Sequence, residues 1–272
     1  MTDNMRFNEI CENVCHTARV AGQFMLDERK IFSSDKIETK GVNDFVSYVD
    51  KKTEELIVGQ LSPLIAGAGF LTEEGTVKQS NNSKYTWIID PLDGTTNYIH
   101  GLSPYAVSIG LTENNIPVLG VVHIASADQC FYAWKDSKAF MNGEEIKPST
   151  VGSIKDSLAI TGFPYRLGEK IDNYMNLIRY LTFNSHGVRR LGSAAADLAY
   201  IAAGWAEVFY QTDLHPWDVA AGAFIARQAG AIVTDFTGGD NYLFGQSILA
   251  TGNTTLGNQM VNLLSEYFPE QQ

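Results

Sequence analysis

The sequence predicts an α+β protein, with α/β as the second choice, in which helices are layered on two β-sheets. The hydrophobic period changes twice along the chain: it is helical up to about residue 61, strand-like between residues 85 and 143, and alternating beyond about residue 150. A chain of 272 residues with 44% apolar residues also supplies a large core. We expect two halves, residues 1–150 (α+β) and 151–272 (α/β), packed on one shared interface.

The first part of the chain predicts two helices. Residues 6–30 form an amphipathic pattern, and a second helix is expected from about Tyr48 to Leu61, with Pro63 just beyond its end. The segment 31–47 is polar and interrupted by Gly41, and the Gly/Ser/Asn-rich segment 75–83 indicates a surface loop. The apolar residues of the first helix recur at three- and four-residue steps: Phe7, Ile10, Cys11, Val14, Ala18, Ala21 and Met25.

The middle of the chain predicts an antiparallel meander. Short runs rich in β-forming residues follow one another with polar breaks between them, and the last run ends in an Asn-Gly turn signal at Asn142-Gly143. The expected strands are 85–90, 105–109, 116–124, 129–134 and 138–143.

Helices and strands alternate after residue 150. We expect strands at 157–162, 205–210, 231–235 and 247–251, and helices at 171–182, 193–204, 217–229 and 255–267.

The charge balance, the apolar pattern and the cysteine count exclude several classes of protein. With 20 Lys+Arg against 31 Asp+Glu, the net charge is −11, and the only dense basic step is Arg189-Arg190, so we do not expect a nucleic-acid partner. The chain begins without a signal-peptide pattern and has no 18-residue apolar run, so we expect no membrane association. Three cysteines cannot all pair, which fits a reduced, cytoplasmic setting. Cys11 and Cys15 are expected to pack in a helix.

The strongest chemical signal is the segment 87–97, WIIDPLDGTTN. A buried strand delivers Asp90 at its end, Pro91 turns the chain, and Asp93 returns three residues later beside Gly94 and Thr95. Two carboxylates beside a Gly-Thr turn suit a hard cation bound together with a phosphate. The alternative is an Asp-Gly turn in which these side chains only cap the backbone.

Three further acidic groups have simpler interpretations when each is taken alone. Glu73 and Glu74 follow an apolar run and could be an exposed pair. Asp218 begins a predicted helix and could be its cap, and Asp50 opens the second predicted helix.

Taken together and in this order, the blocks GVNDFVSYVD (41–50), LTEEG (71–75), WIIDPLDGTTNYIHG (87–101), RRLGSAAADLAYIAAG (189–204) and PWDVAAG (216–222) closely resemble the inositol monophosphatase family. The resemblance spans about residues 36–240. It implies a layered α-β-α-β-α sandwich with two mixed sheets, a lithium-sensitive phosphatase activity that depends on two or three Mg²⁺ ions, a small phosphate ester as substrate, and a homodimer.

The resemblance also implies residue roles. The metal ligands would be Glu73, Asp90, the Leu92 carbonyl, Asp93 and Asp218, which places most ligands in the first half and the substrate pocket with Asp218 in the second. Asp50 and Thr95 would orient the attacking water, and Glu74 would lie behind the ligands or near a third ion. The implied substrate-binding residues are Lys40, Gly94, Thr95, Gly192, Ser193, Ala194, Gln211 and Asp218.

One position departs from the family pattern. Seven residues before Asp218, many inositol phosphatases have a Glu that binds ring hydroxyls, and this chain has Gln211. Glutamine can bond a hydroxyl but has no charge, so the preferred polyol stays open.

The sequence therefore predicts hydrolysis of inositol monophosphate or a similar polyol phosphate by direct in-line attack of water, without a phosphoenzyme. The alternatives within the enzyme class are a relative acting on fructose 1,6-bisphosphate, 3′-phosphoadenosine 5′-phosphate or histidinol phosphate. An alternative of another class is a non-catalytic regulator that binds protein or RNA and retains the fold.

Overall fold

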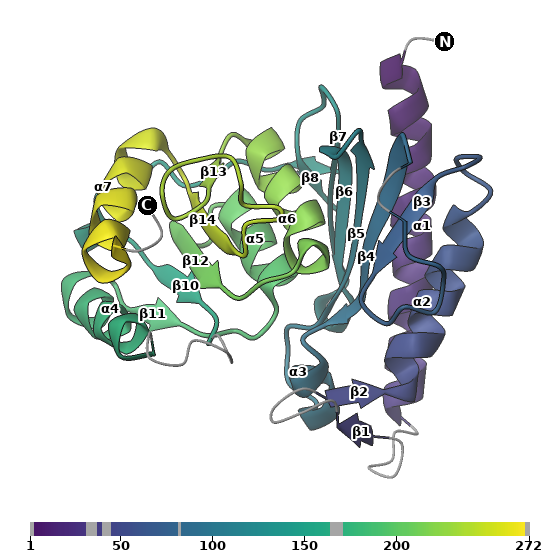
Figure 1. The fold of residues 1–272 in the computed structure, drawn as a ribbon, viewed down its shortest axis with the longest axis horizontal. Helices are drawn as coiled ribbons and strands as arrows, with labels where there is room; N and C mark the ends of the chain where they lie inside the picture. Colours follow the sequence, from purple (N-terminus) through teal and green to yellow (C-terminus); the bar gives the residue numbers. More distant parts are fainter. Residues whose placement is uncertain (1–2, 31–36, 40–44, 81–82, 164–170, 270–272) are drawn as a thin grey trace.

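The computed structural model describes residues 3–30, 37–39, 45–80, 83–163 and 171–269. Its elements stack in five layers, α-β-α-β-α, with one sheet on each side of a central helical layer (Figure 1). The predicted mixed class with two sheets, and the layered sandwich implied by the resemblance, are confirmed. The outer helices on the first side are α1 (Asp3–Lys30) and α2 (Tyr48–Leu61), the central ones α5 (Ala194–Ala202) and α6 (Pro216–Ala229), and the outer ones on the second side α4 (Ile171–Asn184) and α7 (Thr254–Tyr267).

The first sheet has seven strands in the order β3-β4-β5-β6-β7-β8-β9. All neighbours from β4 onward are antiparallel, as predicted, and only β3 runs parallel to β4. Asn142 and Gly143 connect β8 to β9 with φ values of 49° and 95°, the positive values that an Asn-Gly hairpin turn requires. The strands are β3 (Gly69–Thr72), β4 (Tyr85–Asp93), β5 (Ala106–Glu113), β6 (Ile116–Ile124), β7 (Gln129–Trp134), β8 (Phe140–Met141) and β9 (Glu144–Glu145).

Helix α1 covers the first sheet with the stripe that its sequence predicts. All seven residues of the stripe, from Phe7 to Met25, are buried, and they share one hydrophobic cluster with α2 and with β4, β5 and β6. Cys11 is part of this core, as expected, and the cysteines are free thiols.

The central helices pack on the first sheet at very short range. A Cβ added at Gly120 of β6 would lie 2.6 Å from the carbonyl oxygen of Ala221 in α6, so only glycine allows this approach. The small side chains of α5 and α6 share one hydrophobic cluster with residues of both sheets, among them Ile88 and Phe209. The two halves are therefore fixed to each other through this layer, which matters because the candidate site is built from both.

The second sheet has five strands in the order β11-β10-β12-β14-β13. Strand β10 is parallel to both of its neighbours, and β14 is antiparallel to both of its own. The strands are β10 (Ala159–Thr161), β11 (Val188–Arg189), β12 (Val208–Thr212), β13 (Ile232–Thr234) and β14 (Ser247–Thr251).

The structure differs from the sequence prediction in a few elements. The strand expected at 205–210 is β12 at Val208–Thr212, because the Trp205 N–H is already used in bonding the carbonyl of Tyr200 at the end of α5. The short elements that the sequence did not predict include β1 (Ile37–Thr39), β2 (Phe45–Ser47), β3, α3 (Thr95–His100), β9 and β11.

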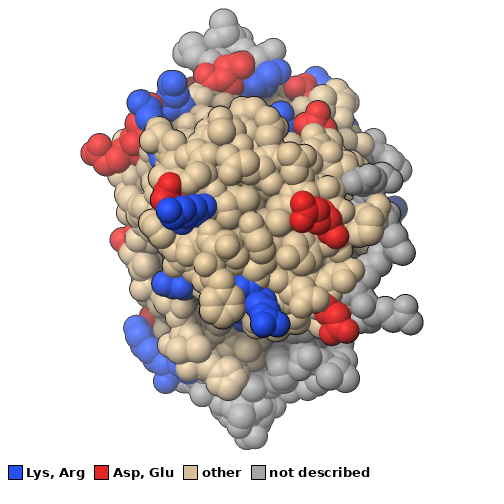
Figure 2. Space-filling view, turned by 90° about the vertical axis from the view of Figure 1, so that its left-hand side faces the viewer, with Lys and Arg blue, Asp and Glu red and all other residues tan. Residues whose placement is uncertain are grey.

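The face formed by α4 and α7 has few charged side chains in its middle (Figure 2). Several large apolar side chains of α4 are exposed, including Met175 and Phe183. In its described part, this face has no stripe of basic side chains of the kind that binds a nucleic-acid backbone. None of the described helices combines the length and apolar character needed to cross a bilayer.

Candidate active site

The end of β4 brings Asp90 and Asp93 to the same side of the sheet. In a regular strand, residues three apart face opposite sides. Here Asp90 pairs with Ser108 and Asp93 with Ala106, so β4 has one residue more than β5 between these pairs. This β-bulge includes Pro91, which has no N–H to offer the ladder. The extra residue turns Asp93 back toward Asp90.

Asp218 reaches the same place from the first turn of α6. Its carboxylate accepts a hydrogen bond from the His215 N–H at 2.6 Å, so it caps the helix as the simpler interpretation expected. The Ser108 hydroxyl, opposite Asp90 on β5, donates to the Trp217 carbonyl at 3.2 Å. This bond holds the start of α6 against the sheet beside Asp90.

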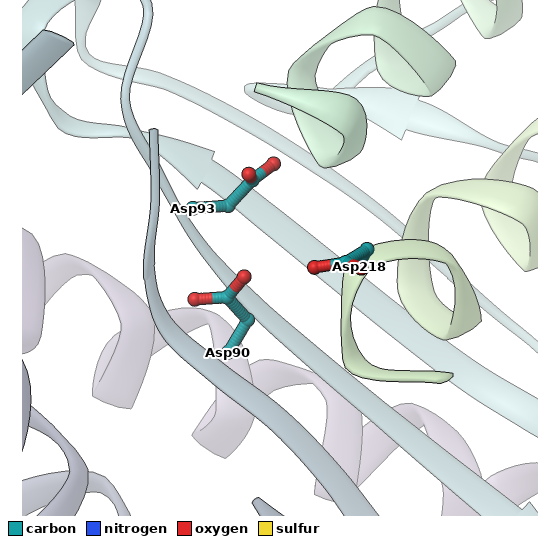
Figure 3. A group of neighbouring side chains, drawn as sticks. All are labelled: Asp90, Asp93 and Asp218. Carbon is teal, nitrogen blue, oxygen red and sulfur yellow. The ribbon is translucent and has the colours of Figure 1, made fainter. Parts of the chain in front are cut away.

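The three aspartates form a candidate metal-ligand group. One ligand oxygen from each of Asp90, Asp93 and Asp218 lies within 4.8 Å of the others. Figure 3 shows the three carboxyl groups around one small space between the end of β4 and the first turn of α6. Asp90 is only 2% exposed, whereas Asp93 and Asp218 are half-buried.

Burial and mutual repulsion strongly disfavour three ionised carboxylates at this point. Burial raises the pKa of Asp90 well above its usual value, and the charges of Glu73, Asp93 and Asp218 raise it further. The pKa of Asp218 is raised by burial and then by Asp93 and Glu73. Burial raises the pKa of Asp93 to about 6, opposed by hydrogen bonds from Ser193 and Ala195. A cation in this space would relieve the repulsion.

Glu73 belongs to the same electrostatic group. It follows β3, and its backbone N–H donates to the Ile89 carbonyl at 3.2 Å, directly beside Asp90. The charge of Glu73 raises the pKa of both Asp90 and Asp218. The role of Glu73 as a metal ligand stays a prediction.

The segment around Gly192 and Ser193 is tied to Asp93. Oδ2 of Asp93 accepts the Ser193 hydroxyl and the Ala195 N–H, each at 2.7 Å. Gly94 has a φ of 95°, and a Cβ there would lie 3.1 Å from the Gly192 carbonyl oxygen. The glycine at position 94 thus allows the turn after β4 to lie against the start of α5. Ser193 is buried, and it also caps α5.

Leu92 lies near the end of β4, and Thr95 is the first residue of α3. The Thr95 hydroxyl donates to the Leu92 carbonyl at 3.1 Å, and the Leu92 N–H donates to Asp90 at 2.9 Å. The hydroxyl oxygen of Thr95 therefore keeps its lone pairs available to accept a hydrogen bond.

The remaining predicted residues lie on several different elements. Asp50 is buried in the first turn of α2, and Glu74 directly follows Glu73. Gln211 lies on β12, where its side-chain amide covers Gly162 so closely that a Cβ on Gly162 would overlap it. Ala194 is the buried first residue of α5. Lys40 lies outside the described residues.

Three residues with a structural role at the site were not singled out in the sequence. Asn97 donates from its side chain to the Leu191 and Pro104 carbonyls, both at 2.7 Å, and so joins the two halves. Asp197 of α5 is buried, and both burial and the charge of Asp93 raise its pKa. Glu54 of α2 is buried beneath the Glu73 segment. Only the position of Asn97 within the DGTTN block could have indicated it.

The five α-β-α-β-α layers and the carboxylates that both halves place around one space define the class of protein. It is a layered protein with an acidic site able to hold a metal ion. The chain belongs to the inositol monophosphatase family, whose sequence profile matches residues 8–267. The resemblance stated from the motifs is therefore confirmed.

Relatives within this family have two kinds of name. The chain is 37% identical over 226 residues to "Inositol-1-monophosphatase" of Mesorhizobium japonicum, covering 83% of each protein. It is 36% identical over 244 residues to "Nus factor SuhB" of Escherichia coli K12, covering 90% of this chain and 89% of the relative. The crystal structure of "extragenic suppressor protein suhB" from Bartonella henselae has a TM-score of 0.88 at 34% identity and covers 94% of this chain and 98% of that one.

Proposed function

We propose that the protein is a Mg²⁺-dependent phosphatase that hydrolyses inositol monophosphate or a similar small polyol phosphate. The observation that supports this most directly is the convergence of Asp90, Asp93 and Asp218, from elements more than 100 residues apart, around one space. Family membership and the name of the Mesorhizobium japonicum relative support the same conclusion.

The donor set fits a hard divalent cation. Mg²⁺ prefers oxygen ligands and is held by a few carboxylates together with the substrate's phosphate. Burial raises the pKa of each carboxylate in the group, and the neighbouring charges raise those of Asp90 and Asp218 further. A bound cation would stabilise the ionised carboxylates and so lower these pKa values. The residues that would hold the ions are Glu73, Asp90, Leu92 through its carbonyl, Asp93 and Asp218.

When bound, Mg²⁺ lowers the pKa of water and offsets the negative charge of the phosphoryl group. The Thr95 hydroxyl donates to the Leu92 carbonyl, so its oxygen accepts a hydrogen bond from the attacking water and orients it, and the Asp50 carboxylate takes up the proton that the water loses. The water attacks phosphorus in line, a new P–O bond forms, and the bond to the alcohol breaks. Gly94 and Thr95 offer N–H groups to the phosphate, and the pocket residues around Gly192 face the alcohol.

The aspartates do not act as nucleophiles in this proposal. Asp93 already accepts two hydrogen bonds on one oxygen, and Asp90 accepts the Leu92 N–H. Each carboxylate is therefore committed to its turn and to the ligand group. Rapid-quench kinetics should show no burst of alcohol release, and a trapped acyl-phosphate would contradict direct attack by water.

The proposal covers a range of phosphate esters and is not limited to inositol monophosphate. Gln211 has no charge, so the protein is expected to accept several polyol phosphates, and fructose 1,6-bisphosphate, 3′-phosphoadenosine 5′-phosphate and histidinol phosphate belong in the test panel. Lithium is expected to inhibit by occupying a metal site, as the family resemblance implies. The resemblance also implies a homodimer, and the free cysteines support a cytoplasmic setting.

A second candidate is a non-catalytic regulator that binds protein or RNA, because several relatives are named "Nus factor SuhB". The presence of all the ligand carboxylates together with Thr95 favours catalysis.

Phosphate release from the panel, measured with and without Mg²⁺, tests the proposal. Asp93→Asn should lower turnover by about three orders of magnitude or more, since electrostatic stabilisation supplies most of the rate enhancement. Asp172→Asn, an exposed aspartate in the first turn of α4, is the matched control and should retain full turnover. Absence of hydrolysis for every ester, with Mg²⁺ present and the wild-type fold intact, would favour the regulator.

A further inference from the structure

Glu54 is a fully buried carboxylate that the proposed reaction does not use. It lies on α2 four residues after Asp50, so the two carboxylates share one face of the helix, and its exposed fraction is 0%. Burying a carboxylate is costly unless hydrogen bonds compensate for the lost water. The partners of Glu54 therefore show what its burial achieves.

Among the described residues, the hydrogen-bond donors to Glu54 belong to one short segment, residues 72–76. Oε1 accepts the hydroxyls of Thr72 and Thr76, at 2.9 and 2.7 Å, and the Thr76 N–H at 2.7 Å. Oε2 accepts the Glu74 N–H at 2.8 Å. A single carboxylate thus accepts four hydrogen bonds, three on Oε1 and one on Oε2, and donates none.

These bonds enclose Glu73. Thr72 precedes it and Glu74 follows it, so both neighbours are held by the same carboxylate. On the other side, the Glu73 N–H bonds the Ile89 carbonyl of β4. The backbone of Glu73 is therefore fixed between α2 and the strand that ends in Asp90, and this fixes the direction in which its side chain leaves the chain.

The bonding pattern requires a carboxylate. A glutamine amide has one acceptor oxygen and one NH₂ donor. In either orientation, the NH₂ group would face an N–H or hydroxyl donor of residues 72–76, and at least one buried donor would lose its partner. An unpaired buried donor is costly, so the segment would move rather than keep its position.

We propose that Glu54 is a positioning residue, which holds segment 72–76 so that the Glu73 carboxylate reaches the group formed by Asp90, Asp93 and Asp218. This inference rests on the proposed function, because Glu73 is assigned there as a metal ligand. A merely structural role would lower stability and leave the metal affinity of the folded protein unchanged. A positioning role lowers the affinity itself.

The test is the affinity of the full chain for Mn²⁺, measured by isothermal titration calorimetry, with circular dichroism as a check of the fold. Glu54→Gln should weaken Mn²⁺ binding about 10- to 100-fold, the usual effect of losing a group that orients metal ligands. Glu55→Gln is the matched control: it removes the same charge from the next residue, which is exposed and pairs with the exposed Lys52. Its affinity should change by less than about twofold.

Thr76→Val keeps the test decisive if Glu54→Gln does not fold. It removes one of the four bonds while the side-chain shape is nearly preserved, and should weaken Mn²⁺ binding several-fold, to a smaller extent than Glu54→Gln. Wild-type affinity in a folded Glu54→Gln protein, or in Thr76→Val where the first variant is unfolded, would overturn the inference.

Asp93→Asn separates this inference from the proposed function. If Asp93→Asn loses Mn²⁺ binding while the Glu54 and Thr76 variants keep it, only the positioning role is wrong. If Asp93→Asn binds Mn²⁺ as the wild type does, the metal site is wrong and the positioning role falls with it.

Discussion

Asp93 and Ser193 are 100 residues apart in the sequence, and the Ser193 hydroxyl donates to Oδ2 of Asp93 at 2.7 Å. This bond joins the end of β4 to the start of α5, and the Ala195 N–H donates to the same oxygen. One oxygen of Asp93 is thereby fixed by the second half of the chain. The other is left for the space that it shares with Asp90 and Asp218.

Ser193→Ala should lower metal affinity and turnover together. It removes a donor that orients Asp93, and we expect an effect of about 10-fold on the Mg²⁺ concentration needed for half-maximal activity. It also removes the cap of α5, at a cost of about 1 kcal/mol in the free energy of unfolding.

The matched control for the lost cap is Asn253→Ala, which removes the N-cap of α7 on the outer layer. It should lose a similar free energy of unfolding and keep the Mg²⁺ dependence of the wild type. An equal rise in the Mg²⁺ requirement for both variants would show that the Asp93–Ser193 bond has no particular role.

The stability of the metal-free protein should depend on pH through the aspartate group. The pKa of Asp93 is about 6 in the folded protein, compared with 3.8 for an aspartate in the unfolded chain. Below pH 4 the carboxyl group is protonated in both states, and its stabilising contribution is complete. As the pH rises from 4 through 6, the contribution is lost, by about 3 kcal/mol at most. Asp90 and Asp218 act in the same direction.

Thermal denaturation between pH 4 and pH 8, in a metal chelator, measures this contribution. The decrease in Tm with pH should be smaller for Asp93→Asn than for the wild type. Mg²⁺ should raise the wild-type Tm more at pH 8 than at pH 5, because protonated carboxyl groups bind the cation poorly. Parallel pH profiles for the two proteins would argue against the raised pKa of Asp93.

Gln211 should set the preference among polyol phosphates. Gln211→Glu is expected to change KM between esters by about 10-fold and to leave kcat nearly constant, because the residue is proposed to contact the alcohol of the substrate and not to hold a metal ion. Gly162→Ala offers an independent variant, since its Cβ would push the Gln211 amide aside. If both variants keep the wild-type KM for every ester in a steady-state panel, the assignment of Gln211 to the pocket is wrong.

Local sequence signals were sufficient for most elements and for the main site motif. The helical spacing from Tyr48 to Leu61 predicted the bounds of α2, and the apolar run ending in Asp90 predicted β4. Asp218 illustrates the limit of local patterns: it is both the cap that its position suggests and a member of the ligand group. Only the order of the motifs along the chain indicated the second role.

Tertiary contacts decide what the sequence left open. Glu54 stands among charged residues in KKTEE, and nothing in that pattern distinguishes it from the exposed Glu55. The bulge in β4 depends on how β5 pairs with it, and β3 is fixed by its parallel pairing with β4. Each of these features arises where segments distant in the sequence meet, so no local window contains it.

The most direct test is a crystal structure of the protein with Mn²⁺ and phosphate, in which anomalous scattering locates the Mn²⁺ ions. We expect a Mn²⁺ peak bound by oxygens of Asp90, Asp93 and Asp218, with Glu73 in its coordination shell and phosphate beside Gly94 and Thr95. A protein that shows Mn²⁺ elsewhere, with the space between the three aspartates filled by water alone at saturating Mn²⁺, would contradict it.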